Sequence, residues 1–306
     1  MLTIFTVPKA FEGHIGVIQR NAIKSWSLLE PKCQVILAGD DEGTDIAALD
    51  LGVEHIPNLT RNDFGTPLLD SAYQQVEDSA RYPFICYVNA DVILMDDFTQ
   101  AVQRAQEQSQ WFLMTAQRWD LEITEPLDFG QGWRKRLLNN VSNRGSLAHH
   151  TGIDFWVYPK GMLYDMPPLA VGRMAIESWC LYKARHMKAD LIDSTKAVVS
   201  VHQSHDYAHH PAGAEGIGIS VEAERNRELI GGKSYFFIIR DRTHVLTATD
   251  FHRSRDAWWA WRSLRTAIVL HPTMPLPLKL ISKGLNSAID LTRDTLIKVR
   301  NLVKRR

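Results

Sequence analysis

The sequence predicts an α/β fold, in which helices flank a mixed, mainly parallel sheet and a helical appendage follows at the C-terminal end. Two observations lead to this prediction. In the first half of the chain, short runs of β-branched and aromatic residues alternate with longer amphipathic runs, and this alternation is typical of βαβ units. The 306 residues are 45% hydrophobic, which is enough for a full core.

Each element of the first half follows from its own run of residues. Strands are expected where apolar, β-branched or aromatic residues run together, over 2–7, 34–38, 53–56, 84–88 and 111–116. Helices are expected where apolar residues recur at helical spacing, over 14–29, 44–51, 68–80 and 97–108. Ligands of such open sheets bind beyond the carboxyl ends of the strands. The residues that directly follow each strand are therefore the first candidates for a site.

The second half has a weaker pattern. Pro, Gly, Asn and charged residues over 121–144 predict a long loop over the site. Further elements are expected as a strand at 153–157, a helix at 175–188, strands near 191 and at 197–201, and a His-rich turn after them.

Charge and cysteine content narrow the classes of function. The sequence has 35 Lys and Arg against 35 Asp and Glu, so it lacks the cationic excess of non-specific nucleic-acid binding, and no nucleic-acid partner is expected. Cys33, Cys86 and Cys180 form no CxxC pair, which indicates neither a disulfide framework nor a cysteine zinc site. The sequence shows no basic leader and no apolar run of roughly 18 residues, so we expect a cytoplasmic location.

The sharpest candidate site follows the strand predicted at 84–88. There the sequence reads Asn89-Ala90-Asp91 and then continues apolar to the next helix. A carboxylate at the end of a buried strand can give an oxygen ligand to a hard cation such as Mn²⁺ or Mg²⁺ that bridges a diphosphate. Asp91 is therefore the leading candidate, and an ordinary Asn/Asp turn is the alternative.

The segment YVNADVILMDDF, residues 87–98, resembles the DxD region of GT-A glycosyltransferases. In that group, acidic residues after a central strand contact the ribose and the metal of the nucleotide-sugar donor. The resemblance implies a GT-A-like (Rossmann-like) fold and donor contacts from Asn89, Ala90 and Asp91. Asn89 stands where the first Asp of the motif is usual, so its amide can bond a ribose hydroxyl but supplies no metal-binding carboxylate.

Other segments match the same group in order along the chain. The loop after the first strand implies that Thr6, Pro8 and Lys9 line the nucleotide pocket. Asp40, after the second strand, stands where family members place a carboxylate on the nucleobase, although acids in this turn can equally cap the next helix. Gly65 belongs to a turn whose counterpart in the family approaches the donor.

A cluster of histidines follows an apolar run late in the chain, at positions 202, 205, 209 and 210. The resemblance implies that one of them completes the metal site, with His202 as the first candidate and His205 as the second, because imidazole is an adequate partner for a carboxylate on Mn²⁺. Surface or core histidines are the alternative. A structural zinc site fits poorly, since no cysteine is near in the sequence.

The acceptor side is expected at the start of the helix over 175–188. By resemblance, Glu177 stands where family members place the carboxylate that takes the proton of the acceptor hydroxyl in an inverting reaction, and Asp154 is the reserve candidate. The alternative for Glu177 is a solvated acid in a first helical turn. Arg173 can pair with a phosphate or with Glu177, and Trp179 can stack on a sugar or belong to the core.

These matches cover about residues 1–210. They imply a glycosyltransferase whose catalytic domain spans 1–250, with a nucleotide-binding part over about 1–118 and an acceptor and metal part over about 145–250. The implied reaction moves a sugar from a UDP-, GDP- or dTDP-sugar to a glycan, lipid-linked or other hydroxyl acceptor, with Mn²⁺ or Mg²⁺. One alternative is a sugar nucleotidyltransferase. Such enzymes usually have a Gly- and Arg-rich loop after the first strand, and the segment TVPKAFEGH at this place lacks that composition. The other alternative is a non-catalytic, membrane-associated nucleotide-sugar binding protein.

Residues 251–306 differ in character from the rest. They carry Trp258, Trp259 and Trp261, a Pro-rich break at 271–278, and then apolar residues at helical spacing among basic ones. Such a segment is typical of an interfacial anchor on anionic lipid, which would place the enzyme on the inner face of a membrane where polysaccharides and lipid-linked glycans are built. Packing on the catalytic domain or on a second copy of the chain is the alternative.

Overall fold

The computed structural model describes residues 2–204, 220–275, 277 and 284. The chain divides into two compact units, Met1–Ser254 and Arg255–Arg306. Both β-sheets belong to the first unit, and the second begins with helix α9 (Ala257–Leu270).

The larger sheet is mixed and mainly parallel, as the sequence predicts. Its nine strands within the described residues have the order β13-β12-β10-β6-β9-β4-β1-β2-β3. β9 runs antiparallel to β4 and β6, and β13 runs antiparallel to β12, while the other neighbours are parallel. The strands are β1 (Thr3–Thr6), β2 (Gln34–Ala38), β3 (Glu54–Ile56), β4 (Phe84–Val88), β6 (Phe112–Thr115), β9 (Phe155–Pro159), β10 (Asp190–Lys196), β12 (His244–Thr247) and β13 (Phe251–Arg253).

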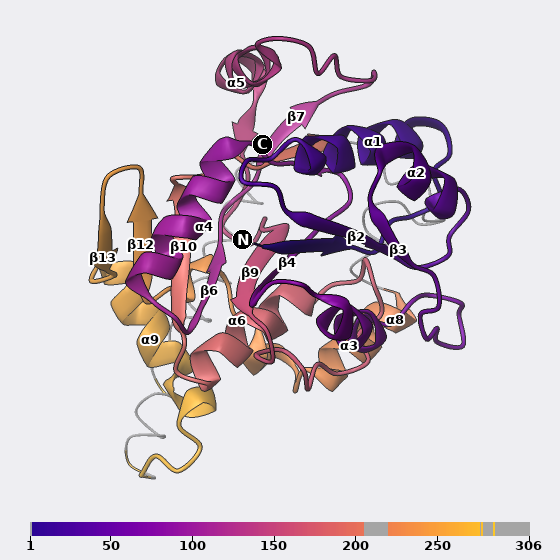
Figure 1. Ribbon diagram of the computed structural model, residues 1–306. Coiled ribbons are helices and arrows are strands. Elements are labelled where there is room, and N and C mark those ends of the chain that lie inside the picture. Colours follow the sequence, from indigo (N-terminus) through magenta and orange to yellow (C-terminus); the bar gives the residue numbers. More distant parts are fainter. Residues whose placement is uncertain (1, 205–219, 276, 278–283, 285–306) are drawn as a thin grey trace, which may run out of the picture. The chain divides into compact units, whose positions relative to one another are not determined.

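Helices cover both faces of this sheet, with α1 and α2 above and α3 and α6 below in Figure 1. The helices of this layered part are α1 (Gly13–Ser27), α2 (Thr44–Leu51), α3 (Leu69–Ser79), α4 (Asp96–Gln108) and α6 (Ile176–His186). Successive side chains of a strand point to opposite faces of the sheet. On one face, Ile4 of β1 packs in one cluster with Trp26 of α1 and Phe98 of α4. On the other face, the ring of Phe5 meets the ring of Tyr73 of α3 edge to face. The predicted α/β layers are thus confirmed.

The prediction of a long loop over 121–144 is wrong. A second sheet, in the order β5-β11-β7-β8, contains β7 (Trp119–Glu122), and helix α5 (Trp133–Arg144) follows β7. The other strands are β5 (Val92–Ile93), β8 (Ser146–Leu147) and β11 (Val201–Ser204). Trp133, Leu137 and Val141 recur every four residues and pack on this sheet. Three apolar positions thus suffice for a helix that packs on a sheet. Their helical spacing is weak in the sequence, because charged residues and Asn occupy most of the other positions of α5.

The strand predicted at 197–201 is also wrong. The backbone turns after β10, where the carbonyl of Ser194 accepts hydrogen bonds from the amides of Ala197 and Val198, and the next strand begins only at Val201. The other predicted elements from 2 to 188 have bounds within two residues of the observed ones, the usual uncertainty of helix and strand ends. Helix α8 (Val221–Leu229), two short 3₁₀ helices (Lys233–Tyr235 and Ile239–Asp241) and strands β12 and β13 were not expected.

In the second unit, α9 begins with Asp256, whose side chain accepts a hydrogen bond from the amide of Trp259 at 2.8 Å. Trp258 and Trp261 meet edge to face on this helix. None of the helices that the structure describes is long and apolar enough to cross a membrane. The predicted basic amphipathic helix beyond residue 284 lies outside the described residues.

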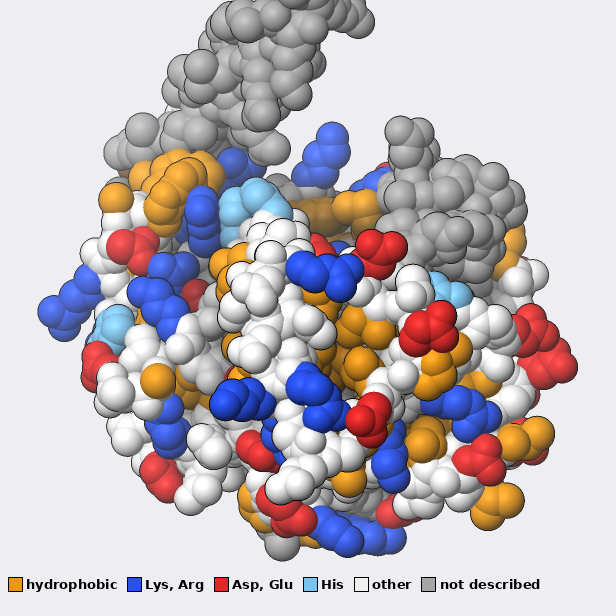
Figure 2. Space-filling model, turned by 90° about the horizontal axis from the view of Figure 1, so that it is seen from above, with side chains coloured by type: hydrophobic (Ala, Val, Ile, Leu, Met, Phe, Trp, Pro, Cys, Tyr) orange, Lys and Arg blue, Asp and Glu red, His pale blue; other side chains and the backbone are white. Residues whose placement is uncertain are grey.

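Charges of both signs are interspersed over the face of the molecule that Figure 2 shows, with Lys and Arg side chains beside Asp and Glu side chains.

Candidate active site

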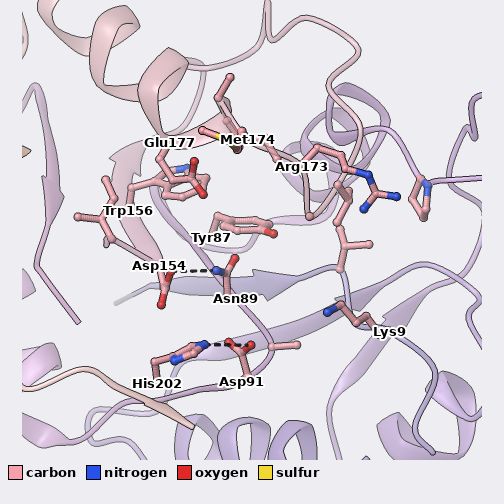
Figure 3. A pocket seen from close by; sticks show the side chains of 18 of the residues that line it. Lys9, Tyr87, Asn89, Asp91, Asp154, Trp156, Arg173, Met174, Glu177 and His202 are labelled. Atoms are coloured by element: carbon pink, nitrogen blue, oxygen red, sulfur yellow. Dashed lines mark hydrogen bonds and ion pairs between the residues drawn. The ribbon is translucent and has the colours of Figure 1, made fainter. Parts of the chain in front are cut away.

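A cleft of about 800 Å³ opens at the carboxyl edge of β1 and β4. The predicted site residues that line it are Pro8, Lys9, Gly65, Asn89, Ala90, Asp91, Asp154, Arg173, Glu177 and His202. In the close-up of Figure 3, Glu177, Tyr87, Asn89 and Asp91 form a row across the cleft, with Asp154 and His202 on one side and Lys9 and Arg173 on the other. The chain thus brings together residues that are distant in sequence.

The turn after β4 is fixed to the start of β9. The amide N–H of Asn89 donates to the carbonyl of Asp154 at 2.9 Å, and its side-chain Nδ2 donates to Oδ1 of Asp154 at 3.1 Å. The antiparallel pairing of Val88 with Phe155 explains this contact, because it brings the beginning of β9 to the end of β4. The side-chain amide of Asn89 is therefore engaged with a carboxylate.

Asp91 lies beside His202 of β11, with Oδ2 of Asp91 3.6 Å from Nε2 of His202. The neighbouring Gln203 sets this placement, because its amide N–H and its Nε2 both donate to the carbonyl of Asp91, at 3.2 and 3.0 Å. Gln203 is fully buried and also bonds Asn21 and the carbonyl of Ile18 of α1. The Asp91–His202 pair thus rests on a buried amide network.

Sequence reasoning missed Arg118 and Asp120. Arg118 Nη1 lies 3.1 and 3.0 Å from the two carboxylate oxygens of Asp154, and its Nε donates to Oδ1 of Asp120 at 2.8 Å. The same oxygen of Asp120 lies 3.0 Å from Nδ1 of His202. Arg118 and Asp120 follow strand β6 closely, so inspecting the end of that strand as well would have found them.

This network shifts the pKa of its members. Burial lowers the pKa of His202, but the hydrogen bond to Asp120 and the charges of Asp91 and Asp154 outweigh burial and raise it above the ordinary value. Asp154 is 4% exposed, and its burial raises its pKa more than the Arg118 guanidinium lowers it.

Glu177 lies in the first turn of α6, at the cleft wall. Burial, with a smaller contribution from the charge of Asp154, raises the pKa of Glu177 to about 7. A carboxyl group with such a pKa can exchange a proton near neutral pH. Both carboxylate oxygens of Asp154 accept from Nη1 of Arg118, and Oδ1 also accepts from Asn89, so Asp154 is the less available base of the two.

Two cations face the other side of the cleft. Burial lowers the pKa of Lys9, and the nearby charge of Arg173 lowers it further, although Asp91 raises it. Arg173 is held by Glu222 of α8, with contacts of 2.9 Å from Nε and 2.6 Å from Nη2. Lys9 and Arg173 together form a basic wall opposite Asp154 and His202.

Three predicted residues of the described part of the chain do not line the cleft. Thr6 is buried within β1, and Trp179 is 5% exposed within the core. Asp40 pairs with Arg61 at 2.5 Å, outside the cleft lining, whereas its neighbour Asp41 lines the cleft and also contacts Arg61. His205 falls outside the described residues.

Among the residues that the structure describes, no three His, Cys, Asp or Glu side chains converge on a common point that could hold a metal ion. Asp91 and His202 are nevertheless a carboxylate and an imidazole facing each other. The hydrogen bond of Asp120 to Nδ1 leaves Nε2 of His202 directed toward Asp91, which is the usual support of a metal-binding histidine. Two protein ligands suit a cation that phosphate oxygens and water also coordinate.

No protein-family model and no curated protein matches the sequence. Solved structures do match in fold. S. aureus TarS 1-349 in complex with UDP-GlcNAc is 10% identical, with a TM-score of 0.50 over 90% of this chain and 73% of that chain. Glucosyl-3-phosphoglycerate synthase from Mycobacterium tuberculosis, in complex with Mn²⁺, UDP and phosphoglyceric acid, is 15% identical, with a TM-score of 0.45 over 76% and 79% of the two chains.

A cytidylyltransferase from Leptospira borgpetersenii is 12% identical, with a TM-score of 0.41 over 63% of this chain and 75% of that one. The likeness to TarS extends over nine-tenths of this chain. The chain therefore has the GT-A-type fold of nucleotide-sugar glycosyltransferases.

Proposed function

We propose that the protein is a glycosyltransferase that moves a sugar from a nucleotide-diphosphate donor to a hydroxyl group of an acceptor, with Glu177 as the general base. The observation that carries the proposal is the place of Glu177 at the wall of the cleft, in a row with the Asn89–Asp91 turn. Burial at this place raises the pKa of the Glu177 carboxyl group to about 7. The GT-A-type fold supports it, because this turn occupies the end of a central strand.

The reaction that fits this arrangement inverts the anomeric centre. Ionised Glu177 takes the proton of the acceptor hydroxyl while that oxygen attacks the anomeric carbon, and the bond from this carbon to the diphosphate breaks. Negative charge then develops on the departing diphosphate. Lys9 and Arg173 lie opposite the acidic side of the cleft, where their positive charge would stabilise the leaving group.

We further propose that Asp91 and His202 hold a Mn²⁺ or Mg²⁺ ion. When bound, such a cation supplies positive charge to the diphosphate. Asp120 supports this role by orienting the imidazole of His202, and Asn89 keeps the turn in place through Asp154. Because Asn89 replaces one carboxylate, we expect the cation to bind weakly until the diphosphate contributes its own oxygens.

UDP-sugars are the first donors to test, because the structure of TarS that this chain resembles in fold was solved with UDP-GlcNAc. GDP- and dTDP-sugars complete the screen, with a sugar, glycan or lipid-linked hydroxyl as acceptor. Thermal shift with and without Mn²⁺ measures binding, since a ligand of the folded state raises the melting temperature by mass action. We expect a Mn²⁺-dependent shift in the native protein that Asp91→Asn abolishes.

Glu177→Gln separates binding from chemistry. The amide keeps the shape of the side chain but cannot accept a proton, so the donor shift should persist while the transfer rate falls about 10²- to 10⁴-fold. Released nucleoside diphosphate is the product to measure. Pyrophosphate released from a nucleoside triphosphate and a sugar 1-phosphate, in a separate assay, would instead indicate a sugar nucleotidyltransferase. A donor shift without turnover on any acceptor would indicate a binding protein, and no shift with any donor would refute the proposal.

We also propose that the C-terminal segment attaches the enzyme to the cytoplasmic face of an anionic membrane. Trp258 is 52% exposed on α9, and Arg265 lies over the ring of Trp261. Aromatic and cationic side chains on one helix favour an interface with anionic lipid. Sedimentation with vesicles should retain the native protein on anionic lipid and lose Trp258→Ser to the supernatant; equal recovery on neutral and anionic vesicles would contradict the proposal.

A further inference from the structure

Helix α8 lies behind the segment 170–175, which forms one wall of the cleft. Its residue Asn226 is 1% exposed. Asn226 Oδ1 accepts from the amide of Ala170 at 2.9 Å, and Nδ2 donates to the carbonyls of Ala170 and Met174 at 3.1 and 3.3 Å. One buried side chain thus bonds both ends of the segment.

Glu222, one turn earlier on α8, holds the side chain of Arg173 in the same segment. The carboxylate of Glu222 is 7% exposed and takes two contacts from Arg173, at 2.9 and 2.6 Å. Burial alone would raise the pKa of Glu222, but bonds from Thr66, Asn62 and Arg173 outweigh it and lower the pKa. Glu222 therefore remains charged opposite the guanidinium.

The second partner of Glu222 belongs to another wall of the cleft. Asn62 Nδ2 donates to Glu222 at 2.7 Å, and Asn62 Oδ1 accepts from the amides of Phe64 and Thr66, at 2.9 and 3.0 Å. These bonds shape the turn that places Gly65 and Thr66 in the cleft lining. Glu222 thus links the turn near the expected donor to the segment that leads to Glu177.

The backbone at the end of this segment needs such support. Ala175 has φ +90° and is the N-cap of α6, two residues before Glu177. A residue with a Cβ atom is unfavourable in this left-handed region and persists there only when its surroundings fix it. The bond from Asn226 to the carbonyl of Met174 holds the residue directly before Ala175.

We propose that Glu222 and Asn226 of α8 are positioning residues, of which Glu222 directs Arg173 into the cleft and Asn226 sets the start of α6 and hence the place of Glu177. The functional half of this inference, that these residues affect donor binding and transfer, rests on the proposed glycosyltransferase activity. The structural half states that Glu222 and Asn226 hold two walls of the cleft in the ligand-free protein, and it does not depend on that activity. The two halves are therefore tested separately.

The structural half is tested by amide hydrogen exchange on the ligand-free protein. In both Glu222→Ala and Asn226→Ala, we expect the amides of residues 170–177 to exchange about tenfold faster than in the native protein. In Glu222→Ala, the amides of residues 62–68 should also exchange faster. In both variants the amides of β4 should keep their protection. Glu228→Ala is the matched control, because Glu228 is an exposed acid in the last turn of the same helix. Unchanged exchange in both segments would overturn the proposal.

A loss of protection in β4 would mean that Glu222→Ala unfolds the whole domain. Glu222→Gln then decides, because the amide still accepts one bond but carries no charge. Faster exchange of 62–68 and 170–177 in Glu222→Gln, with β4 protected, supports the proposal. Exchange equal to that of the native protein in Glu222→Gln overturns the role of the carboxylate.

The functional half is tested by double-mutant cycles on the transfer reaction. Because Glu222 holds Arg173, Glu222→Ala should raise KM for the donor about tenfold. When Arg173 is already replaced by Ala, Glu222→Ala should cause little further change in KM. Through Glu177, Asn226→Ala should lower kcat about tenfold and add little in a Glu177→Gln background. Additive effects in both cycles would overturn the proposal. If exchange changes as expected but the native protein transfers no sugar, the glycosyltransferase function fails while the positioning of both walls stands.

Discussion

Nδ1 of His202 lies 3.0 Å from Oδ1 of Asp120, while the other ring nitrogen faces Asp91. Asp120 is thus the main support for the charged form of His202. In Asp120→Asn, which keeps the shape but removes the charge, we expect the pKa of His202 to fall below that of the native protein. NMR titration of the imidazole measures this, and an unchanged pKa would contradict the assigned role of Asp120.

The chain offers a matched control for this variant. His252 and Asp250 form a similar pair at 2.8 Å, with both side chains at least half exposed, so Asp250→Asn should leave the pKa of His202 as it is. If His202 also binds Mn²⁺, Asp120→Asn should raise the Mn²⁺ concentration needed for donor binding about 10- to 100-fold at pH 8, where protons no longer compete. Asp250→Asn should show no such change.

The transfer rate should depend on the ionisation of Glu177. Only the carboxylate can accept the acceptor proton, so kcat should rise about tenfold per pH unit on the acid side and level off above a pH of about 7. Rates at saturating donor and acceptor from pH 5 to 9 measure this. The residual rate of Glu177→Gln should lack the step near pH 7; a plateau that already begins at pH 5 would argue against Glu177 as the base.

The same group should make stability depend on pH. The folded-state pKa of Glu177 is raised from 4.5 to about 7, so the folded protein binds the proton more tightly than the unfolded chain. The stabilisation from the protonated form is complete below about pH 4.5 and is lost as pH rises through about 7. Relative to the native protein, Glu177→Gln should therefore gain up to about 3 kcal/mol in the free energy of unfolding between pH 5 and pH 9.

Urea denaturation at several pH values measures this difference. Glu224→Gln is the control, because Glu224 is a largely exposed acid outside the cleft lining. A constant difference between the native protein and Glu177→Gln would show that Glu177 has an ordinary pKa.

Gln203 should contribute to stability as well as to the site. Its side chain makes buried bonds with Asn21, with the carbonyl of Ile18 and with that of Asp91. Gln203→Met leaves these groups without that partner and should lower the free energy of unfolding by about 2–4 kcal/mol. Gln103→Met, at an exposed position of α4 where the side chain of Gln103 bonds Glu107, should change the free energy of unfolding by less than about 0.5 kcal/mol in urea denaturation.

Regular spacing made most of the layered part predictable. The runs at 34–38, 44–51 and 84–88 became β2, α2 and β4 with the same bounds, because a strand buried on both faces and an amphipathic helix each leave a local pattern. Helix α5 could not be predicted, since its apolar face is narrow and its partner sheet is built from β5, β7, β8 and β11, which are distant in sequence. Such a helix depends on tertiary contact more than on its own pattern.

The cleft residues divide in the same way. Asn89, Asp91 and Lys9 directly follow strands, so position alone marks them as candidates. Arg118 and Asp120 also follow a strand, so their position marks them as candidates. Their roles depend on contacts, however, and no local pattern in the sequence shows that Asp120 meets His202 across two paired strands. The role of Glu222 was still harder to predict from the sequence, because its contact with Arg173 joins a helix that was not expected to a segment without regular structure.

The antiparallel strand β9 has a consequence for how the cleft can change. Asp154 reaches Asn89 from the beginning of β9, so the register of Val88 opposite Phe155 sets their distance. Inserting or deleting one residue inside β9 would move Asp154 by about 3.4 Å relative to β4 and turn every side chain of the shifted part to the other face of the sheet. Variation in length should therefore be tolerated in the loops around the cleft but not within this strand, where a single codon gained or lost would dismantle the network from Asn89 to His202.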